Sequence, residues 1–154
     1  LEGGADLLAA ETLLYPQDAE AILTAAELEG AETVMYSFTM QPDGSFFSGM
    51  DAGKTLRELE EAGAAAVGFN CVAADMMTPG LVSKLRRQVK GPLICKPNAG
   101  IPVIQPGNVV EYPMLPDEFA DIVADCHAMG AKILGGCCGT APEYIAAVKE
   151  RVCK

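Results

Sequence analysis

The stretch Met129-Gly130-Ala131-Lys132-Ile133-Leu134 places a glycine between a helical pattern and a short apolar run. Similar phrases occur at residues 2–8, 29–35 and 62–67, and in the last two the glycine again follows a helical pattern. A glycine just past a helix ends it, because glycine adopts positive φ at little cost. The run that follows is short and two-sided, as in a buried parallel strand. The phrase therefore predicts repeated helix-to-strand units.

The rest of the chain continues this alternation. Apolar residues spaced i, i+3, i+4 predict helices over about 17–29, 52–62, 79–89, 117–129 and 141–152. Short apolar runs predict strands near 5–10, 33–38, 65–70, 92–96 and 131–135. Five alternating pairs predict an α/β fold with a parallel sheet and right-handed crossovers. Thr140 and Glu143 further predict a capping box before the last helix.

Two architectures accommodate five such units. One is a complete five-stranded open sheet, and the other is the later part of a (β/α)8 barrel. A whole barrel needs about 250 residues, whereas this chain has 154, and its first residues already have the pattern of the end of a unit. We infer the later five βα units of a barrel whose N-terminal strands are missing, although the pattern alone favours the two architectures equally.

Composition restricts the partners and the compartment. The formal net charge is −10, and such an acidic surface repels phosphate backbones, so we expect no nucleic acid partner. No apolar run approaches the roughly 20 residues of a membrane helix, so we expect no membrane partner. Six cysteines in a chain without a visible signal peptide favour reduced thiols in the cytoplasm over a disulfide framework.

Prolines interrupt the alternation between Pro97 and Pro116. Because proline prevents regular strand pairing, this segment is predicted to be a long loop. Loops of that length in compact domains often serve a site.

Three cysteines lie where predicted strands end. Cys71 follows the apolar run 65–70, and Cys137 and Cys138 lie in Gly135–Thr140, whose sequence is GGCCGT. Ligands of parallel α/β folds bind beyond the carboxyl ends of the strands, and the glycines let the backbone turn so that both adjacent cysteines face one ion. Three thiolates with one free position suit a catalytic zinc. Three metal-free cysteines remain an alternative, because the spacing lacks the C-x2-C pairs of structural zinc.

A family resemblance strengthens the zinc hypothesis. The phrases Gly68–Cys71 (GFNC), Lys96–Gly100 (KPNAG) and Gly135–Thr140 resemble the homocysteine S-methyltransferase family. This family includes the homocysteine-binding module of cobalamin-dependent methionine synthase and the betaine-dependent enzymes. The similarity extends from about Ala5 to Val152. It implies a (β/α)8 barrel with zinc on three cysteines, here Cys71, Cys137 and Cys138.

The resemblance also suggests substrate-binding residues. Glu11, in Ala10-Glu11-Thr12, matches a family position at a strand end that binds the amino group of homocysteine, and a carboxylate suits an ammonium. An exposed carboxylate without a role is the alternative. We assign Asn70 and Asn98 to the substrate site, where they would orient loops or support the ligands, with ordinary turn chemistry an equal alternative. The acidic strand-one motif of the family is absent, so three strands should be missing.

The resulting expectation is zinc-dependent methyl transfer to homocysteine, giving methionine. The thiol of homocysteine would become the fourth zinc ligand and attack an activated methyl group. Methylcobalamin, betaine-like onium compounds and S-methylmethionine all qualify as donors, and a corrinoid would be bound by a separate module. Expected partners are the missing barrel half, a corrinoid module or another copy of the chain. The alternatives are a different barrel enzyme that binds phosphate at Gly135–Thr140, and a non-catalytic metal-binding fragment.

Overall fold

The computed structural model describes residues 2–77 and 79–153, and within them the chain forms an α/β fold around one five-stranded sheet. All four strand pairings are parallel, which confirms the predicted sheet. In spatial order the strands are β1 (Leu8–Leu13), β2 (Val34–Phe38), β3 (Ala66–Ala73), β4 (Leu93–Asn98) and β7 (Ile133–Leu134).

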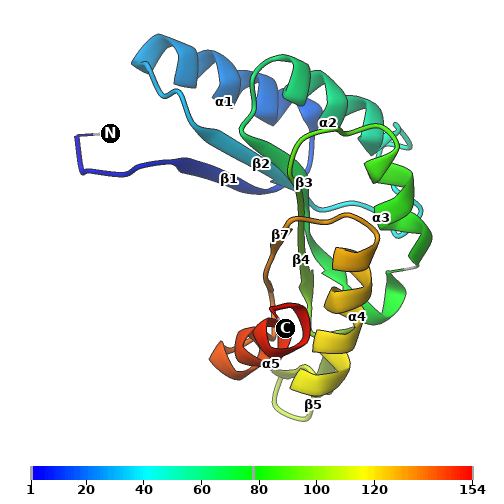
Figure 1. Cartoon of the computed structure of the whole chain (residues 1–154). Helices are drawn as coiled ribbons and strands as arrows, with labels where there is room; N and C mark the ends of the chain where they lie inside the picture. Colours follow the sequence, from blue (N-terminus) through cyan, green and yellow to red (C-terminus); the bar gives the residue numbers. More distant parts are fainter. Residues whose placement is uncertain (1, 78, 154) are drawn as a thin grey trace.

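The helices lie on the convex side of the curved sheet (Figure 1). They are α1 (Pro16–Glu29), α2 (Ala52–Glu61), α3 (Pro79–Arg86), α4 (Pro116–Ala128) and α5 (Pro142–Val152), with a 3-10 turn η1 (Ala74–Met76). The strands keep their chain order across the sheet, whereas a doubly wound open sheet reverses direction at a switch point. The arrangement is therefore part of a barrel wall. None of the helices in the described residues has the length and hydrophobicity of a membrane span.

The proline-rich segment differs from the predicted loop. It contains a small antiparallel hairpin, β5 (Val103–Gln105) with β6 (Val109–Glu111). Its turn uses left-handed φ angles at Gly107 and Asn108, residue types that tolerate this conformation. Pairing is possible because the prolines flank the paired residues without entering them.

Two hydrophobic clusters hold the helices onto the sheet. The larger joins α1, α2 and α3 to β2–β4 and includes Phe38, Phe69, Leu56 and Leu85, all fully buried. The smaller joins α4 to α5, where the rings of Phe119 and Tyr144 meet edge to face at 5.6 Å. Because the core lies between sheet and helices, the concave face of the sheet is left for a site.

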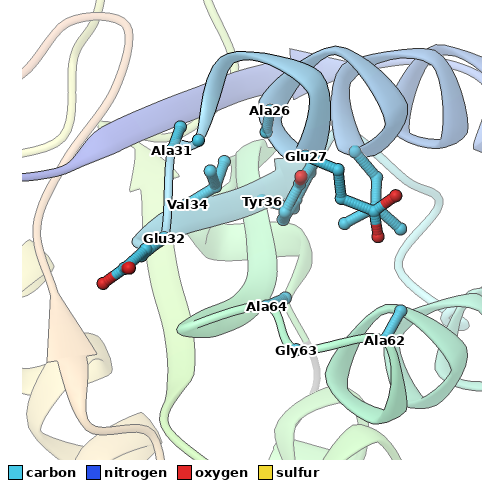
Figure 2. Close-up of a pocket in the computed structure, with 11 residues that line it drawn as sticks. Ala26, Glu27, Ala31, Glu32, Val34, Tyr36, Ala62, Gly63 and Ala64 are labelled. Atoms are coloured by element: carbon cyan, nitrogen blue, oxygen red, sulfur yellow. The ribbon is translucent and has the colours of Figure 1, made fainter. Parts of the chain in front are cut away.

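A pocket of about 310 Å³ lies between α1 and α2 (Figure 2). It is lined by the segments that precede β2 and β3, such as Ala31 and Gly63, and therefore lies at the amino ends of these strands. The buried hydroxyl of Tyr36 has no hydrogen-bond partner among the described residues, and burial together with the charge of Glu27 raises its pKa. The pocket is at the opposite strand ends from the cysteines.

Candidate metal centre

Cys71 lies in a bulge, where the sequence had predicted the end of a strand. Both Cys71 in β3 and Thr12 in β1 have φ of 59°, a left-handed conformation that is uncommon for residues other than glycine. The strand registers shift at the same places, between Ala10 and Leu13 and between Asn70 and Ala73. Such bulges redirect side chains next to active sites. The bulge in β3 thus breaks the alternation of side chains at Cys71 while the strand continues to Ala73.

Asn70 connects the two bulges to the thiols. Its side chain, only 1 % exposed, accepts the Thr12 N–H at 2.9 Å and donates to Thr12 Oγ1 at 2.6 Å. The same Nδ2 donates to Cys137 Sγ at 3.6 Å. Asn70 therefore supports β1 and one thiol, and its contact with substrate stays a prediction.

The Gly135–Thr140 loop is attached to the end of β4. Asn98 Oδ1 accepts the Cys138 N–H at 3.0 Å. Three backbone hydrogen bonds add to it: Gly135 N–H to Cys95 O (3.2 Å), Cys137 N–H to Pro97 O (2.8 Å) and Ala99 N–H to Cys138 O (2.9 Å). Asn98 thus holds the backbone of the cysteine loop through its side chain, and its place in the substrate site stays a prediction.

The same bonds argue against a phosphate-binding loop. Such a loop presents free N–H groups to the anion, but those of Gly135, Cys137 and Cys138 already donate to other groups of the chain.

Thr140 also bonds within the loop, since its N–H and its hydroxyl both donate to Cys137 O, at 3.2 and 2.7 Å. The predicted capping box is therefore wrong: the N-cap of α5 is Ala141, which makes no side-chain cap bond.

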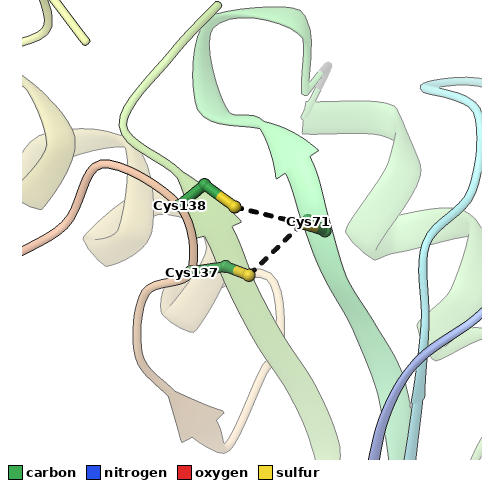
Figure 3. A group of neighbouring side chains, drawn as sticks. All are labelled: Cys71, Cys137 and Cys138. Carbon is green, nitrogen blue, oxygen red and sulfur yellow. Dashed lines mark hydrogen bonds between the residues drawn. The ribbon is translucent and has the colours of Figure 1, made fainter. Parts of the chain in front are cut away.

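The three cysteines converge at the carboxyl ends of β3 and β7 (Figure 3). Cys71 Sγ lies 3.3 Å from Cys137 Sγ and 3.6 Å from Cys138 Sγ, and all three sulfur atoms are within 4.8 Å of one another. A tetrahedral zinc with bonds of about 2.3 Å requires sulfur separations of about 3.8 Å. Cys138 is exposed and the other two are half-buried. The donor set fits zinc with a fourth position open to solvent.

The electrostatics of the cluster also suit a cation. Burial, the hydrogen bonds that the protonated Cys71 thiol makes with Cys137 and Cys138, and the negative charge of these two residues raise the pKa of Cys71 to about 12. Burial also disfavours ionisation of Cys137, but hydrogen bonds from Cys71 and Asn70 outweigh it and lower its pKa. Neighbouring thiolates repel one another, so only one ionises readily without a compensating charge. A bound divalent cation removes that restriction.

Tyr112, to which the sequence assigned no role, covers the cysteine loop. Burial and the charge of Cys138 raise the pKa of its hydroxyl. Its ring packs against Gly139, which has φ of 78°, and a Cβ added there would lie 2.2 Å from Tyr112 Cγ. No local pattern marks this contact, because it joins the proline-rich segment to a loop far along the chain.

Gly139→Ala is expected to destabilise the loop and weaken zinc binding. A left-handed alanine costs roughly 1–3 kcal/mol, and the added methyl group must displace the Tyr112 ring. Gly107→Ala is the matched control, since Gly107 has φ of 87° but nothing within 4 Å of its added Cβ. Zinc competition with a chromophoric chelator should show a loss for Gly139→Ala alone. Equal zinc affinities in the two variants would contradict the role given to Tyr112.

Glu11 lies within β1, whereas the sequence predicts it at a strand end. Its carboxylate accepts a hydrogen bond from Lys96 Nζ of β4. Lys96 was not among the predicted site residues, because only the curvature of the sheet brings these two strands opposite each other. The Glu11 carboxylate, which was predicted to bind a substrate ammonium, is therefore already paired with the ammonium group of Lys96 in this structure.

The known proteins to which this chain is similar agree with one another. The sequence model of the homocysteine S-methyltransferase family matches residues 1–152. A methionine synthase of Mycobacterium tuberculosis is 31 % identical over 99 % of this chain, which spans 13 % of that protein. Homocysteine S-methyltransferase YbgG of Bacillus subtilis is 31 % identical over 94 % of this chain, which spans 46 % of it.

Solved structures agree with the sequence relatives. The metallated form of the homocysteine methyltransferase MmuM from Escherichia coli, a TIM barrel, superposes with a TM-score of 0.79 at 29 % identity. The superposition covers 97 % of this chain and 46 % of MmuM. The fold is thus about half of such a barrel, and the chain spans less than half the length of these relatives. With its family match over nearly every residue, this chain belongs to the homocysteine S-methyltransferase family.

Proposed function

We propose that this chain supplies the zinc site and the homocysteine site of an enzyme that methylates homocysteine to methionine. The observation that carries the proposal is the convergence of three thiols within 4.8 Å at the carboxyl ends of the strands. Membership of the homocysteine S-methyltransferase family indicates which reaction this geometry would serve, and the metallated form of MmuM shows that a relative binds a metal. We also propose a cytoplasmic location, where the thiols of such a site would stay reduced.

Cys71, Cys137 and Cys138 would hold the zinc. When bound, the ion lowers the pKa of a thiol that reaches it, so that homocysteine reacts as a thiolate at neutral pH. The chain's own residues arrange the rest: Asn70 and Asn98 hold Cys137 and the Cys138 backbone, and Glu11 would bind the substrate ammonium. The zinc held by the three cysteines and the Glu11 carboxylate would then fix the sulfur and the amino group of one substrate.

The methyl transfer itself is a direct displacement. The homocysteine sulfur forms a bond to the methyl carbon as the bond between that carbon and its carrier breaks, and the carrier leaves with the electron pair. The thiol proton passes to solvent. The donor must therefore have a good leaving group, as methylcobalamin, betaine-like onium compounds and S-methylmethionine have. For a corrinoid donor, we propose a separate binding module.

The rest of the barrel is also part of the proposal. Within the described sheet, β1 and β7 each pair on one side only. Their other edges carry unpaired backbone N–H and C=O groups, which must be paired or covered. Three further strands between these two edges would complete eight. We propose that another segment or chain, or a second copy, supplies them together with part of the substrate pocket.

Isotope transfer tests the function directly. The zinc-loaded protein, with any flanking sequence it naturally carries, is incubated with homocysteine and each donor class labelled in its methyl group. Labelled methionine is expected from at least one donor, and a chelator should abolish it while added zinc restores it. If no donor yields labelled methionine from the zinc-loaded protein, the proposed activity is wrong.

A further inference from the structure

Lys96 crosses the concave face of the sheet. It starts in β4, and its Cγ, Cδ and Cε atoms pass 3.2–3.6 Å from where a Cβ on Gly135 would lie. Its ammonium group then reaches Glu11 in β1, the strand at the far side of β2 and β3. Because Gly135 has no side chain, the Lys96 stem can lie against it. Lys96 and Glu11 thus form an ion pair on the concave face of the sheet.

The ion pair borders a cavity of about 230 Å³. Glu11, Lys96 and Ser37 are its polar lining, and Met35, Ile94 and Leu134 contribute apolar surface. Ser37 is 2 % exposed, and its hydroxyl has no hydrogen-bond partner among the described residues. A buried hydroxyl without a partner is uncommon and calls for a bound group or water. The cavity therefore offers an anion, a cation and a free hydroxyl together.

This combination matches both charges of an amino acid. An ammonium that binds Glu11 competes with Lys96 for the carboxylate, and displacing Lys96 would leave its charge unpaired in a half-buried position. Unpaired charges in such positions are costly. A ligand carboxylate next to the ammonium compensates the displaced lysine, so that one ion pair becomes two charge-assisted pairs.

We propose that Lys96 binds the carboxylate of the substrate amino acid, and that its pair with Glu11 is the resting state of this site. The inference rests on the proposed function, because it takes homocysteine as the ligand. The amino-acid end would lie next to the thiols, since Asn70 links Thr12, adjacent to Glu11, with Cys137. Lys96 then selects thiols that carry both an ammonium and a carboxylate over thiols that lack the carboxylate.

Calorimetric titration with three thiols tests the assignment. The ligands are homocysteine, 4-mercaptobutanoate, which lacks the ammonium, and 3-aminopropane-1-thiol, which lacks the carboxylate. In the zinc-loaded protein, Lys96→Met is expected to weaken the first two by about 10–100-fold, the range of a lost hydrogen bond between charged groups. Binding of 3-aminopropane-1-thiol should not weaken, because Glu11 loses a competitor. Lys96→Arg, which keeps the charge, should restore most of the lost affinity.

The controls separate this role from a structural one. Lys54→Met removes another lysine–glutamate pair, with Glu58 at 3.6 Å on the surface of α2, and should change none of the three affinities. Lys96→Gln replaces Lys96→Met if the latter does not fold, and zinc content is measured in every variant. If Lys96→Met weakened the binding of all three ligands equally, or left the binding of the two carboxylate ligands unchanged, the inference about Lys96 would be overturned but the proposed function would not. Failure of the unaltered protein to bind any of the thiols would contradict the proposed function as well.

Discussion

Replacing Cys137 by alanine is expected to remove stoichiometric zinc and, with it, methyl transfer. Cys137 is a proposed zinc ligand, and its sulfur contacts both Cys71 Sγ at 3.3 Å and Asn70 Nδ2 at 3.6 Å. Losing a partner that only supports a ligand costs 10–100-fold in metal affinity. Losing one of three ligands should cost more, on the order of 1000-fold. Metal analysis after dialysis and transfer of labelled methyl measure both effects.

Cys153→Ala is the matched control for this variant. Cys153 is an exposed thiol just beyond α5 and takes no part in the cluster. The control should keep about one zinc per chain and unchanged transfer, as expected for a single site. If Cys137→Ala retained zinc and activity at the level of Cys153→Ala, the three-thiol site would be refuted.

Replacing Asn70 by alanine is expected to cost both stability and metal affinity. The change leaves the Thr12 N–H without its acceptor and removes the donor to Cys137 Sγ. Each buried polar group left unpaired costs about 1–3 kcal/mol, so a loss of roughly 3 kcal/mol in the free energy of unfolding is expected. Zinc affinity should fall about 10–100-fold, as for other supports of metal ligands. Urea unfolding and chelator competition measure the two losses.

Asn70→Asp separates the two roles of this side chain. Aspartate has the same shape and still accepts the Thr12 N–H, but it cannot donate to Cys137 Sγ and it adds negative charge beside the thiols. It should therefore recover much of the unfolding free energy without restoring zinc affinity. Asn98→Ala, which loses only the bond to the Cys138 N–H, should cost less, about 1 kcal/mol. An Asn70→Ala variant as stable as the parent would contradict the bridge between the bulges.

The repeating units were predictable because each depends on a local rule. Gly30, Gly63 and Gly130 all have the positive φ that a helix-ending glycine provides, and a parallel strand follows each one. The convergence of Cys71 with Cys137 and Cys138 was also predictable, since the carboxyl ends of parallel strands meet at one edge. The order of the strands, which distinguishes a barrel wall from an open sheet, is not encoded in any local pattern.

Most of the features that the sequence did not predict depend on contacts between residues that are far apart in the chain. The left-handed conformation of Thr12 goes with a hydrogen bond that its N–H donates to Asn70, 58 residues away, and the Lys96–Glu11 pair spans 85 residues. The capping box failed for a local reason, because the Thr140 hydroxyl donates to the carbonyl of Cys137 in the same loop. Only the three-dimensional fold reveals these partners.

X-ray absorption at the zinc edge tests the central claim most directly. Without substrate, the zinc-loaded protein should show three sulfur neighbours at about 2.3 Å and one lighter atom. Adding homocysteine should convert the shell to four sulfur neighbours, whereas Cys137→Ala should not give the three-sulfur shell. A shell with fewer than three sulfur atoms in the unaltered protein, or one that homocysteine leaves unchanged, would contradict the account.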